Sequence, residues 1–255
     1  MVVSKEEFNG KVALVTGGAA GIGRATALGL AAGGAQVVVS DIAVEAGEAV
    51  AAEIRAAGGS AHFRRADATQ GSEVRELVAF AAGLTGRLDI AHNNVGFSWG
   101  TGVEDITEED WDKTVDLCMK APWLCMKSEL PLMVAKGTGA IVNTASMSGV
   151  RYSEVANVAY SAAKAAVIHM TRYVAVAYAK HGIRVNAVSP GLVKTQAVEK
   201  FLDPEQQNAL AAMSQPIGRI ISPDEIADAV IWLCSGAASM VTGENVCVAG
   251  GHQAL

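Results

Sequence analysis

Two side chains in the sequence have the types and the spacing of a proton-transfer pair. Tyr160 and Lys164 are four residues apart, so on a helix they lie on the same face. A tyrosine with an ordinary pKa of about 10 becomes a useful base at neutral pH only if its pKa falls to about 7, which takes ~4 kcal/mol. One ammonium group ~4 Å away, at an effective dielectric constant of about 20, supplies ~4 kcal/mol. The pair therefore predicts a general acid/base, Tyr160, whose pKa Lys164 lowers, although this spacing also occurs by chance on exposed helices.

Ser146 is the candidate for holding a substrate oxygen beside Tyr160. It follows the apolar run 140–142, and ligands bind at the carboxyl ends of the strands in parallel sheets. Its hydroxyl both donates and accepts hydrogen bonds, so it can orient an alcohol or carbonyl oxygen. Ser148 is the other candidate at this place, and we expect Ser146 to be the residue used.

A glycine-rich turn near the N-terminus has the chemistry of a dinucleotide site. The segment 16–23 reads TGGAAGIG and lies between an apolar run at 12–15 and a helical pattern. Glycines permit a tight turn and a close approach of the backbone, and the following helix presents free N–H groups and its positive dipole end to a pyrophosphate. The residues expected to bind the cofactor here are Gly17, Gly21, Ile22 and Gly23. Such a turn can also be purely structural, so the acid after the next apolar run is the deciding feature.

That acid is Asp41, which closes the apolar run 37–39 and lies 18 residues after Gly23. A ribose-binding carboxylate is expected roughly 20 residues after the glycine turn. The carboxylate accepts hydrogen bonds from the ribose hydroxyls and repels the 2′-phosphate of NADP, and positions 18 and 19 provide no cation for that phosphate. Asp41, with Ile42 beside it, therefore predicts NAD as the cofactor; the alternative is a solvated loop acid.

Apolar runs alternate with longer helical patterns along the whole chain. We expect strands at 12–15, 37–39, 60–63, 88–91, 140–142, 183–188 and 246–248, and helices at 23–32, 45–57, 73–82, 109–134, 160–180 and 223–234. Apolar runs without polar alternation indicate strands that are buried on both faces, and their alternation with helices predicts a parallel sheet covered on both sides. The sequence thus predicts one doubly wound α/β domain over residues 1–255, with a substrate-covering flap near 191–218.

The composition excludes several classes of protein. The 255 residues are 51% hydrophobic and 18% charged with a net charge of −6, which excludes a disordered chain and argues against nucleic-acid or anionic-membrane binding. Four cysteines without a Cys-x-x-Cys pair and five scattered histidines predict neither a metal site nor a disulfide framework. The first ten residues lack the apolar segment of a signal peptide, and no run is long enough for a transmembrane helix. We therefore expect a cytoplasmic protein.

Together these segments resemble the short-chain dehydrogenase/reductase family over essentially the whole chain. The resemblance rests on the glycine turn 16–23, Asp67, the segment 93–96 (NNVG), Ser146, Tyr160 with Lys164, and the segment 186–191 (NAVSPG). It implies a Rossmann-like domain with about seven parallel strands. It also implies the NAD-linked transfer of a hydride between the nicotinamide and a secondary alcohol or ketone.

The resemblance assigns further residues to the cofactor. By similarity, Asp67 and Ala68 would lie beside the adenine, and Lys164 would bind the nicotinamide ribose together with Tyr160. The remaining residues expected to contact NAD are Asn93, Val95, Gly96, Pro190, Gly191, Val193 and Thr195. Because the family is usually tetrameric and sometimes dimeric, we expect a homotetramer, with a dimer as the alternative, joined through the helices at 109–134 and 160–180 and the C-terminal tail. Its expected substrate is a small-molecule alcohol or ketone.

One position departs from the family pattern. Most members carry an asparagine in the helix after the fourth strand, where it holds a water of the proton relay, and this register places Cys118 there. A thiol is a weak hydrogen-bond donor and acceptor, so we expect an active enzyme with an altered relay. Two other functions stay open from the sequence alone: a non-catalytic NADH-binding sensor or regulatory subunit, and a lyase or epimerase that uses bound NAD transiently.

Overall fold

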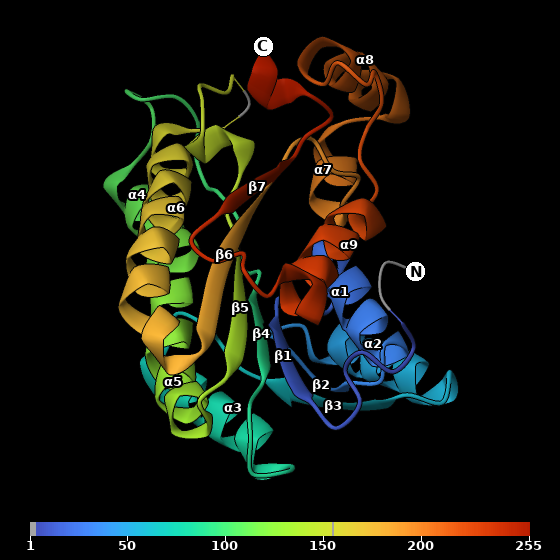
Figure 1. The fold of residues 1–255 in the computed structure, drawn as a ribbon. Coiled ribbons are helices and arrows are strands. Elements are labelled where there is room, and N and C mark those ends of the chain that lie inside the picture. The colour runs from blue at the N-terminus through green and yellow to red at the C-terminus, as the bar shows by residue number, and fades with distance from the viewer. Residues whose placement is uncertain (1–3, 155) are drawn as a thin grey trace.

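The computed structural model describes residues 4–154 and 156–255, and its centre is a parallel sheet of seven strands (Figure 1). The strands lie in the order β3-β2-β1-β4-β5-β6-β7. Their bounds are β1 Val12–Thr16, β2 Gln36–Asp41, β3 Ser60–Arg65, β4 Ile90–Asn93, β5 Gly139–Thr144, β6 Ile183–Pro190 and β7 Asn245–Val248. From β1, the strands β2 and β3 are added on one side and β4 to β7 on the other, so the order of the strands reverses between β1 and β4. Ligands bind in the crevice at such a switch point in open α/β sheets.

Helices cover both faces of the sheet. On one face lie α1 Gly21–Ala32, α2 Val44–Ala56 and α9 Pro223–Cys234. On the other face lie α3 Gly71–Gly83, α4 Glu108–Val115, α5 Ala121–Lys136 and α6 Val158–Tyr178. Each face has its own apolar core, and the strands contribute side chains to both. The doubly wound parallel sheet predicted from the alternating pattern is thus confirmed, with all seven strands.

Two elements differ from the prediction at their ends. The fourth strand begins at Ile90 rather than residue 88, because the buried Asp89 carboxylate accepts from the Val12 N–H at 2.9 Å and pairs with Arg87. The helix expected at 109–134 is two α-helices joined by a π-helical turn, Asp116–Lys120. Hydrophobic periodicity does not detect a local change from α to π winding, and such turns are frequent at functional sites.

The segment expected to be a flap contains two short helices, α7 Gln196–Phe201 and α8 Pro204–Ser214. Asp203 caps α8 in a reciprocal capping box with Gln206. The buried side chain of Gln215 closes the base of the segment, since its oxygen accepts from Leu192 N at 2.8 Å and its nitrogen donates to Arg219 O at 2.7 Å. Gln215 therefore holds the two ends of this segment close together.

A buried polar cluster lies between the sheet and α5. Glu129 is 0% exposed, and one of its oxygens accepts from the Asn93 amide at 3.2 Å, while Asn93 also donates to Asn143 and Asn143 to Thr171. The other Glu129 oxygen has no partner among the described residues. Burial raises the pKa of Glu129 to about 8, so the carboxyl group is neutral at pH 7.

Glu129 is therefore expected to make stability decrease as the pH rises. A carboxyl group whose pKa is higher in the folded than in the unfolded protein stabilises the fold fully below the unfolded pKa, and this contribution is lost as the pH rises towards about 8. Glu129→Gln stays neutral at every pH, so its free energy of unfolding should decrease by on the order of 3 kcal/mol less over this pH range than that of the unchanged protein. Urea unfolding of both proteins between about pH 5 and pH 8 measures the difference. An equal pH dependence in both proteins would contradict the raised pKa.

Candidate active site

The catalytic pair predicted from the sequence lies at the N-terminal end of α6. Lys164 is 1% exposed, and its ammonium group donates to the carbonyl oxygen of Thr144 at 2.7 Å, at the end of β5. The same ammonium lies 5.6 Å from the centroid of the Tyr160 ring. The two side chains thus share one face of the helix and point to the carboxyl edge of the sheet, as the i, i+4 spacing indicates.

The surroundings of Tyr160 shift its pKa in both directions. Burial raises the pKa of Tyr160 well above its usual value, the nearby Cys118 thiol adds to this effect, and only the hydrogen bond with Ser146 lowers it. Burial also lowers the pKa of Lys164. The lowering of the Tyr160 pKa by Lys164, helped by the positive charge of an oxidised nicotinamide, stays a prediction for the site with cofactor bound. In the protein alone, burial has the largest effect and Tyr160 keeps its proton at neutral pH.

Ser146 rather than Ser148 faces the tyrosine. The Ser146 side chain lies near the Tyr160 hydroxyl and lowers its pKa, and the Ser146 hydroxyl oxygen accepts from the backbone N–H of Ser148 at 3.1 Å. That second bond fixes the Ser146 hydroxyl at the start of the short turn after β5. The structure thus brings Ser146, Tyr160 and Lys164 together around one point.

The glycine turn has the geometry that a pyrophosphate site needs. Gly17 has a φ of +62°, which other residues rarely adopt. A Cβ on Gly23 would overlap the carbonyl oxygen of Gly17, so the turn closes only with glycine there. The first turn of α1 contains Ile22, has no acidic residue and has no side-chain cap, so its N–H groups point out free. These features fit a bound dinucleotide phosphate.

Asp41 lies directly against this turn. Its two oxygens accept from Ala19 N at 3.1 Å and Ala43 N at 3.0 Å, which fixes the carboxylate at the end of β2. The neighbouring Ile42 is 64% exposed, so its apolar side chain is free to pack on a ligand. At the end of β3, Asp67 accepts from Thr69 N and Oγ1. Ala68 beside it is buried.

The two asparagines after β4 have different environments. Asn93 is 2% exposed and its side chain bonds inside the core, so it does not face the glycine turn. Asn94, which is not among the predicted cofactor residues, donates to Gly17 O at 3.2 Å and accepts from the Thr144 hydroxyl at 3.0 Å. The alternation of side chains along the strand could have identified Asn94, because it places consecutive residues on opposite faces.

Val95 and Gly96, which follow Asn94, lead from the glycine turn towards the catalytic pair. The Val95 backbone nitrogen lies 3.4 Å from the position of a Cβ on Gly17. A Cβ on Gly96 would lie 3.0 Å from the Lys164 ammonium nitrogen, so the chain passes close to this group. The segment after β4 therefore connects the glycine turn to the catalytic lysine.

The segment after β6 reaches the glycine turn from the other side. Pro190 ends β6, and Gly191 N bonds to Val248 O at 3.0 Å. The buried Val193 pairs with Ile221, and Thr195 caps α7. The Thr195 methyl lies 3.3 Å from the position of a Cβ on Gly21, so the base of the flap and the glycine turn are neighbours.

Cys118 is buried in the π-helical turn beside the catalytic pair. Its thiol donates to the carbonyl oxygen of Phe97 at 3.1 Å. All four cysteines are free, and the described part of the chain contains no cluster of metal-ligating side chains. Within that part, none of the helices is long and apolar enough to cross a membrane.

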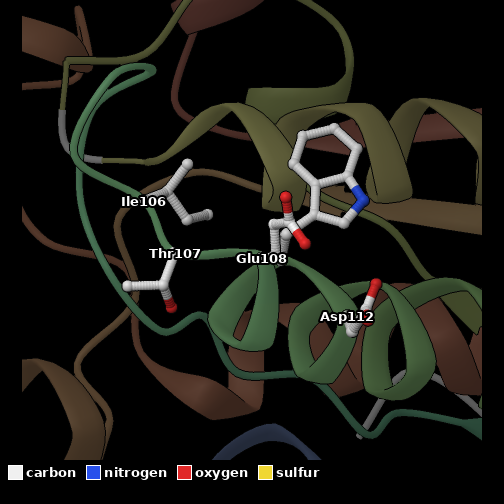
Figure 2. A pocket seen from close by; sticks show the side chains of 5 residues that line it. Ile106, Thr107, Glu108 and Asp112 are labelled. Atoms are coloured by element: carbon white, nitrogen blue, oxygen red, sulfur yellow. The ribbon is translucent and has the colours of Figure 1, made fainter.

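A surface hollow of about 370 Å³ lies elsewhere, at the start of α4 (Figure 2). It is lined by Ile106, Thr107, Glu108, Trp111 and Asp112. None of the residues predicted to act on cofactor or substrate lines this hollow, so it is separate from the site at the edge of the sheet.

Comparison with known proteins gives matches over nearly the whole chain. Residues 17–253 match a family model described as Enoyl-(Acyl carrier protein) reductase. The chain is 39% identical to a cyclohexanol dehydrogenase of Acinetobacter sp. (strain SE19), covering 98% of each protein. It is 42% identical to a 2,5-dichloro-2,5-cyclohexadiene-1,4-diol dehydrogenase of Sphingobium indicum, covering 98% of this chain and 99% of that protein. A solved short-chain type dehydrogenase/reductase from Mycobacterium marinum superimposes with a TM-score of 0.92 at 36% identity, covering 99% of both chains.

The fit at Gly23 gives a direct test of the glycine turn. Gly23→Ala forces the turn open, because the new methyl group meets the backbone oxygen of Gly17. We expect the Kd for NADH, measured by fluorescence titration, to rise at least about tenfold, which equals about 1.4 kcal/mol. Gly83→Ala is the control, since a Cβ there meets no atom within 4 Å. Unchanged NADH binding by a folded Gly23→Ala protein would show that the turn does not hold the cofactor.

Proposed function

Because this chain belongs to the short-chain dehydrogenase/reductase family, an oxidoreductase family that uses a nicotinamide cofactor, we propose that it is an NAD-dependent dehydrogenase of a cyclic secondary alcohol. It would interconvert this alcohol and the corresponding ketone. The observation that carries the proposal is the grouping of Ser146, Tyr160 and Lys164 at the sheet edge, beside the glycine turn.

The protein's own residues have distinct roles in this reaction. Ser146 holds the substrate oxygen against Tyr160, whose hydroxyl donates a proton in ketone reduction and whose phenolate accepts one in alcohol oxidation. Tyr160 is protonated at neutral pH, which is the form that ketone reduction starts from, but the raised pKa makes it a weaker acid. An oxidised nicotinamide supplies the hydride acceptor and, when bound, a positive charge that favours the phenolate needed for oxidation. Lys164 is the other positive charge near the ring.

The choice of NAD over NADP is supported by Asp41. Its carboxylate is fixed beside the glycine turn by two backbone N–H groups, in the place where the ribose hydroxyls of the adenosine would bind. The same negative charge opposes a 2′-phosphate. Ile42 and Ala68 offer apolar contact to the adenine, with Asp67 beside it.

The cyclic substrate is supported by two relatives whose names specify six-membered rings, and by the aromatic side chains that follow β4. Phe97 and Trp99 pack edge to face with ring centroids 4.9 Å apart. They follow Gly96, which lies against Lys164. An apolar wall of this kind suits the carbon ring of an alcohol better than a charged or strongly polar substrate.

The expected homotetramer is likewise a proposal, and exposed apolar side chains on two helices support it. Trp123 on α5 is 44% exposed, and Tyr173 and Val176 on α6 are 74% and 82% exposed. Large apolar side chains on adjacent surfaces are typical of subunit interfaces.

Replacement of the proposed acid/base tests the function. With NAD⁺ and cyclohexanol, Tyr160→Phe should lower kcat by about 10²–10⁴-fold, as expected for the loss of general acid/base catalysis. NADH binding should be retained, and Tyr173→Phe, an exposed tyrosine on the same helix, should keep its activity. Turnover that persists in Tyr160→Phe would exclude the assigned role. Absence of turnover in the unchanged protein, despite NADH binding, would favour a sensor.

The cofactor preference is tested separately at Asp41. Asp41→Asn removes the negative charge and should lower kcat/KM for NAD⁺ about tenfold, the effect of ~1.4 kcal/mol. The ratio of kcat/KM for NADP⁺ to that for NAD⁺ should rise, because the repulsion of the 2′-phosphate is gone. Glu48→Gln, which removes an exposed charge from α2, should leave the ratio unchanged. A ratio that stays constant in Asp41→Asn would contradict the role of this carboxylate.

A further inference from the structure

Asn157 joins two segments that the reaction needs in a fixed relation. It is the last residue before α6 and is 5% exposed. Its side-chain oxygen accepts from the Tyr160 backbone N–H at 2.8 Å, which caps the helix. Its side-chain nitrogen donates to Trp99 O at 2.6 Å and Gly100 O at 3.1 Å. The cap alone needs only an acceptor, so the amide nitrogen has a second task.

That second task concerns the aromatic loop, which we define as residues 97–100. Two further side chains bond to its backbone: the Cys118 thiol donates to Phe97 O at 3.1 Å, and Trp99 N donates to the Thr114 hydroxyl at 3.2 Å. The backbone is thus held from α4, from the π-helical turn and from the start of α6. The rings of Phe97 and Trp99 take no part in these bonds and pack on each other.

The aromatic loop lies next to the reacting groups. The residue before it, Gly96, passes the Lys164 ammonium, with a Cβ position 3.0 Å from the nitrogen. At its other end the loop is bonded to Asn157, three residues before Tyr160. The loop backbone is therefore held against the first turn of the helix that carries Tyr160 and Lys164.

We propose that Asn157 is a positioning residue that sets substrate specificity, because it fixes the Phe97–Trp99 wall at a constant distance from the Tyr160 hydroxyl. This inference rests on the proposed function. A six-membered ring held at Ser146 and Tyr160 extends further from the reacting carbon than a three-carbon alcohol does, so the ring is the substrate expected to contact the wall. A fixed wall thus contributes to binding and orientation of the ring but not of the small alcohol.

Two substitutions separate the helix cap from the hydrogen bonds that Asn157 makes to the aromatic loop; we call these bonds, to Trp99 O and Gly100 O, the clamp. Asn157→Ser keeps an oxygen that caps the helix but lacks the amide that reaches Trp99 and Gly100. Asn157→Asp keeps the shape and the cap, but places a carboxylate oxygen against two carbonyl oxygens. Ser222→Ala is the matched control, because Ser222 caps α9 away from the site.

The experiment measures kcat/KM for cyclohexanol and for 2-propanol with NAD⁺. In Asn157→Ser, kcat/KM for cyclohexanol should fall about tenfold, equal to about 1.4 kcal/mol, with a rise in KM, while the value for 2-propanol changes little. Asn157→Asp should show the larger loss, and Ser222→Ala should lower only the thermal stability. Equal losses for both alcohols, or no loss for either, would overturn the proposal.

Hydrogen exchange tests the clamp independently of the substrate. In Asn157→Ser, amides of residues 97–100 should exchange faster than in the unchanged protein, while those of the α6 interior keep their protection. If the unchanged protein oxidised neither alcohol, the proposed function would fail and the exchange result would still decide on the clamp. If the exchange rates of residues 97–100 were the same in Asn157→Ser and in the unchanged protein, the proposal that Asn157 fixes this loop would be overturned.

Discussion

The buried ammonium group of Lys164 is the constraint on which the site depends. It is nearly inaccessible, and among the described residues its hydrogen-bond partner is a backbone carbonyl, that of Thr144, rather than a carboxylate. A buried charge is costly unless it is hydrogen-bonded, so β5 must end where this carbonyl is available. The Thr144 hydroxyl then bonds to Asn94, and Asn94 to Gly17 O. The catalytic helix, the strand ends and the glycine turn therefore form one connected network.

The sheet and the glycine turn could be predicted from the sequence because both depend on local patterns. A strand buried on both faces needs an uninterrupted apolar run, and a tight strand–helix turn needs glycine at positions such as Gly17 and Gly23. The pairing of Tyr160 with Lys164 follows from helix geometry alone. The predicted topology also places the glycine turn, Asp41 and this pair correctly, at the carboxyl ends of the parallel strands.

The remaining features depend on tertiary contacts that no local pattern contains. The pKa of Tyr160 is raised mainly because the side chain is buried, and burial of this kind depends on the whole fold. The side chain of Asn93 bonds inside the core, whereas that of Asn94 bonds to the glycine turn, and the contact of Asn93 with the cofactor stays a prediction. The partners of Asn157 are 57 and 58 residues away in the sequence. Helices α7 and α8 have only six and eleven residues, so a helical periodicity is weakly developed in each.

The proposed mechanism requires Tyr160 to transfer the proton and to ionise when NAD⁺ is bound for oxidation. An ultraviolet difference titration of tyrosinate, with and without NAD⁺, in the unchanged protein and in Tyr160→Phe, tests this directly. We expect that one tyrosine, absent in Tyr160→Phe, ionises at a lower pH in the NAD⁺ complex than in the protein alone. A titration that NAD⁺ does not change, or that Tyr160→Phe retains in full, would exclude this role of Tyr160.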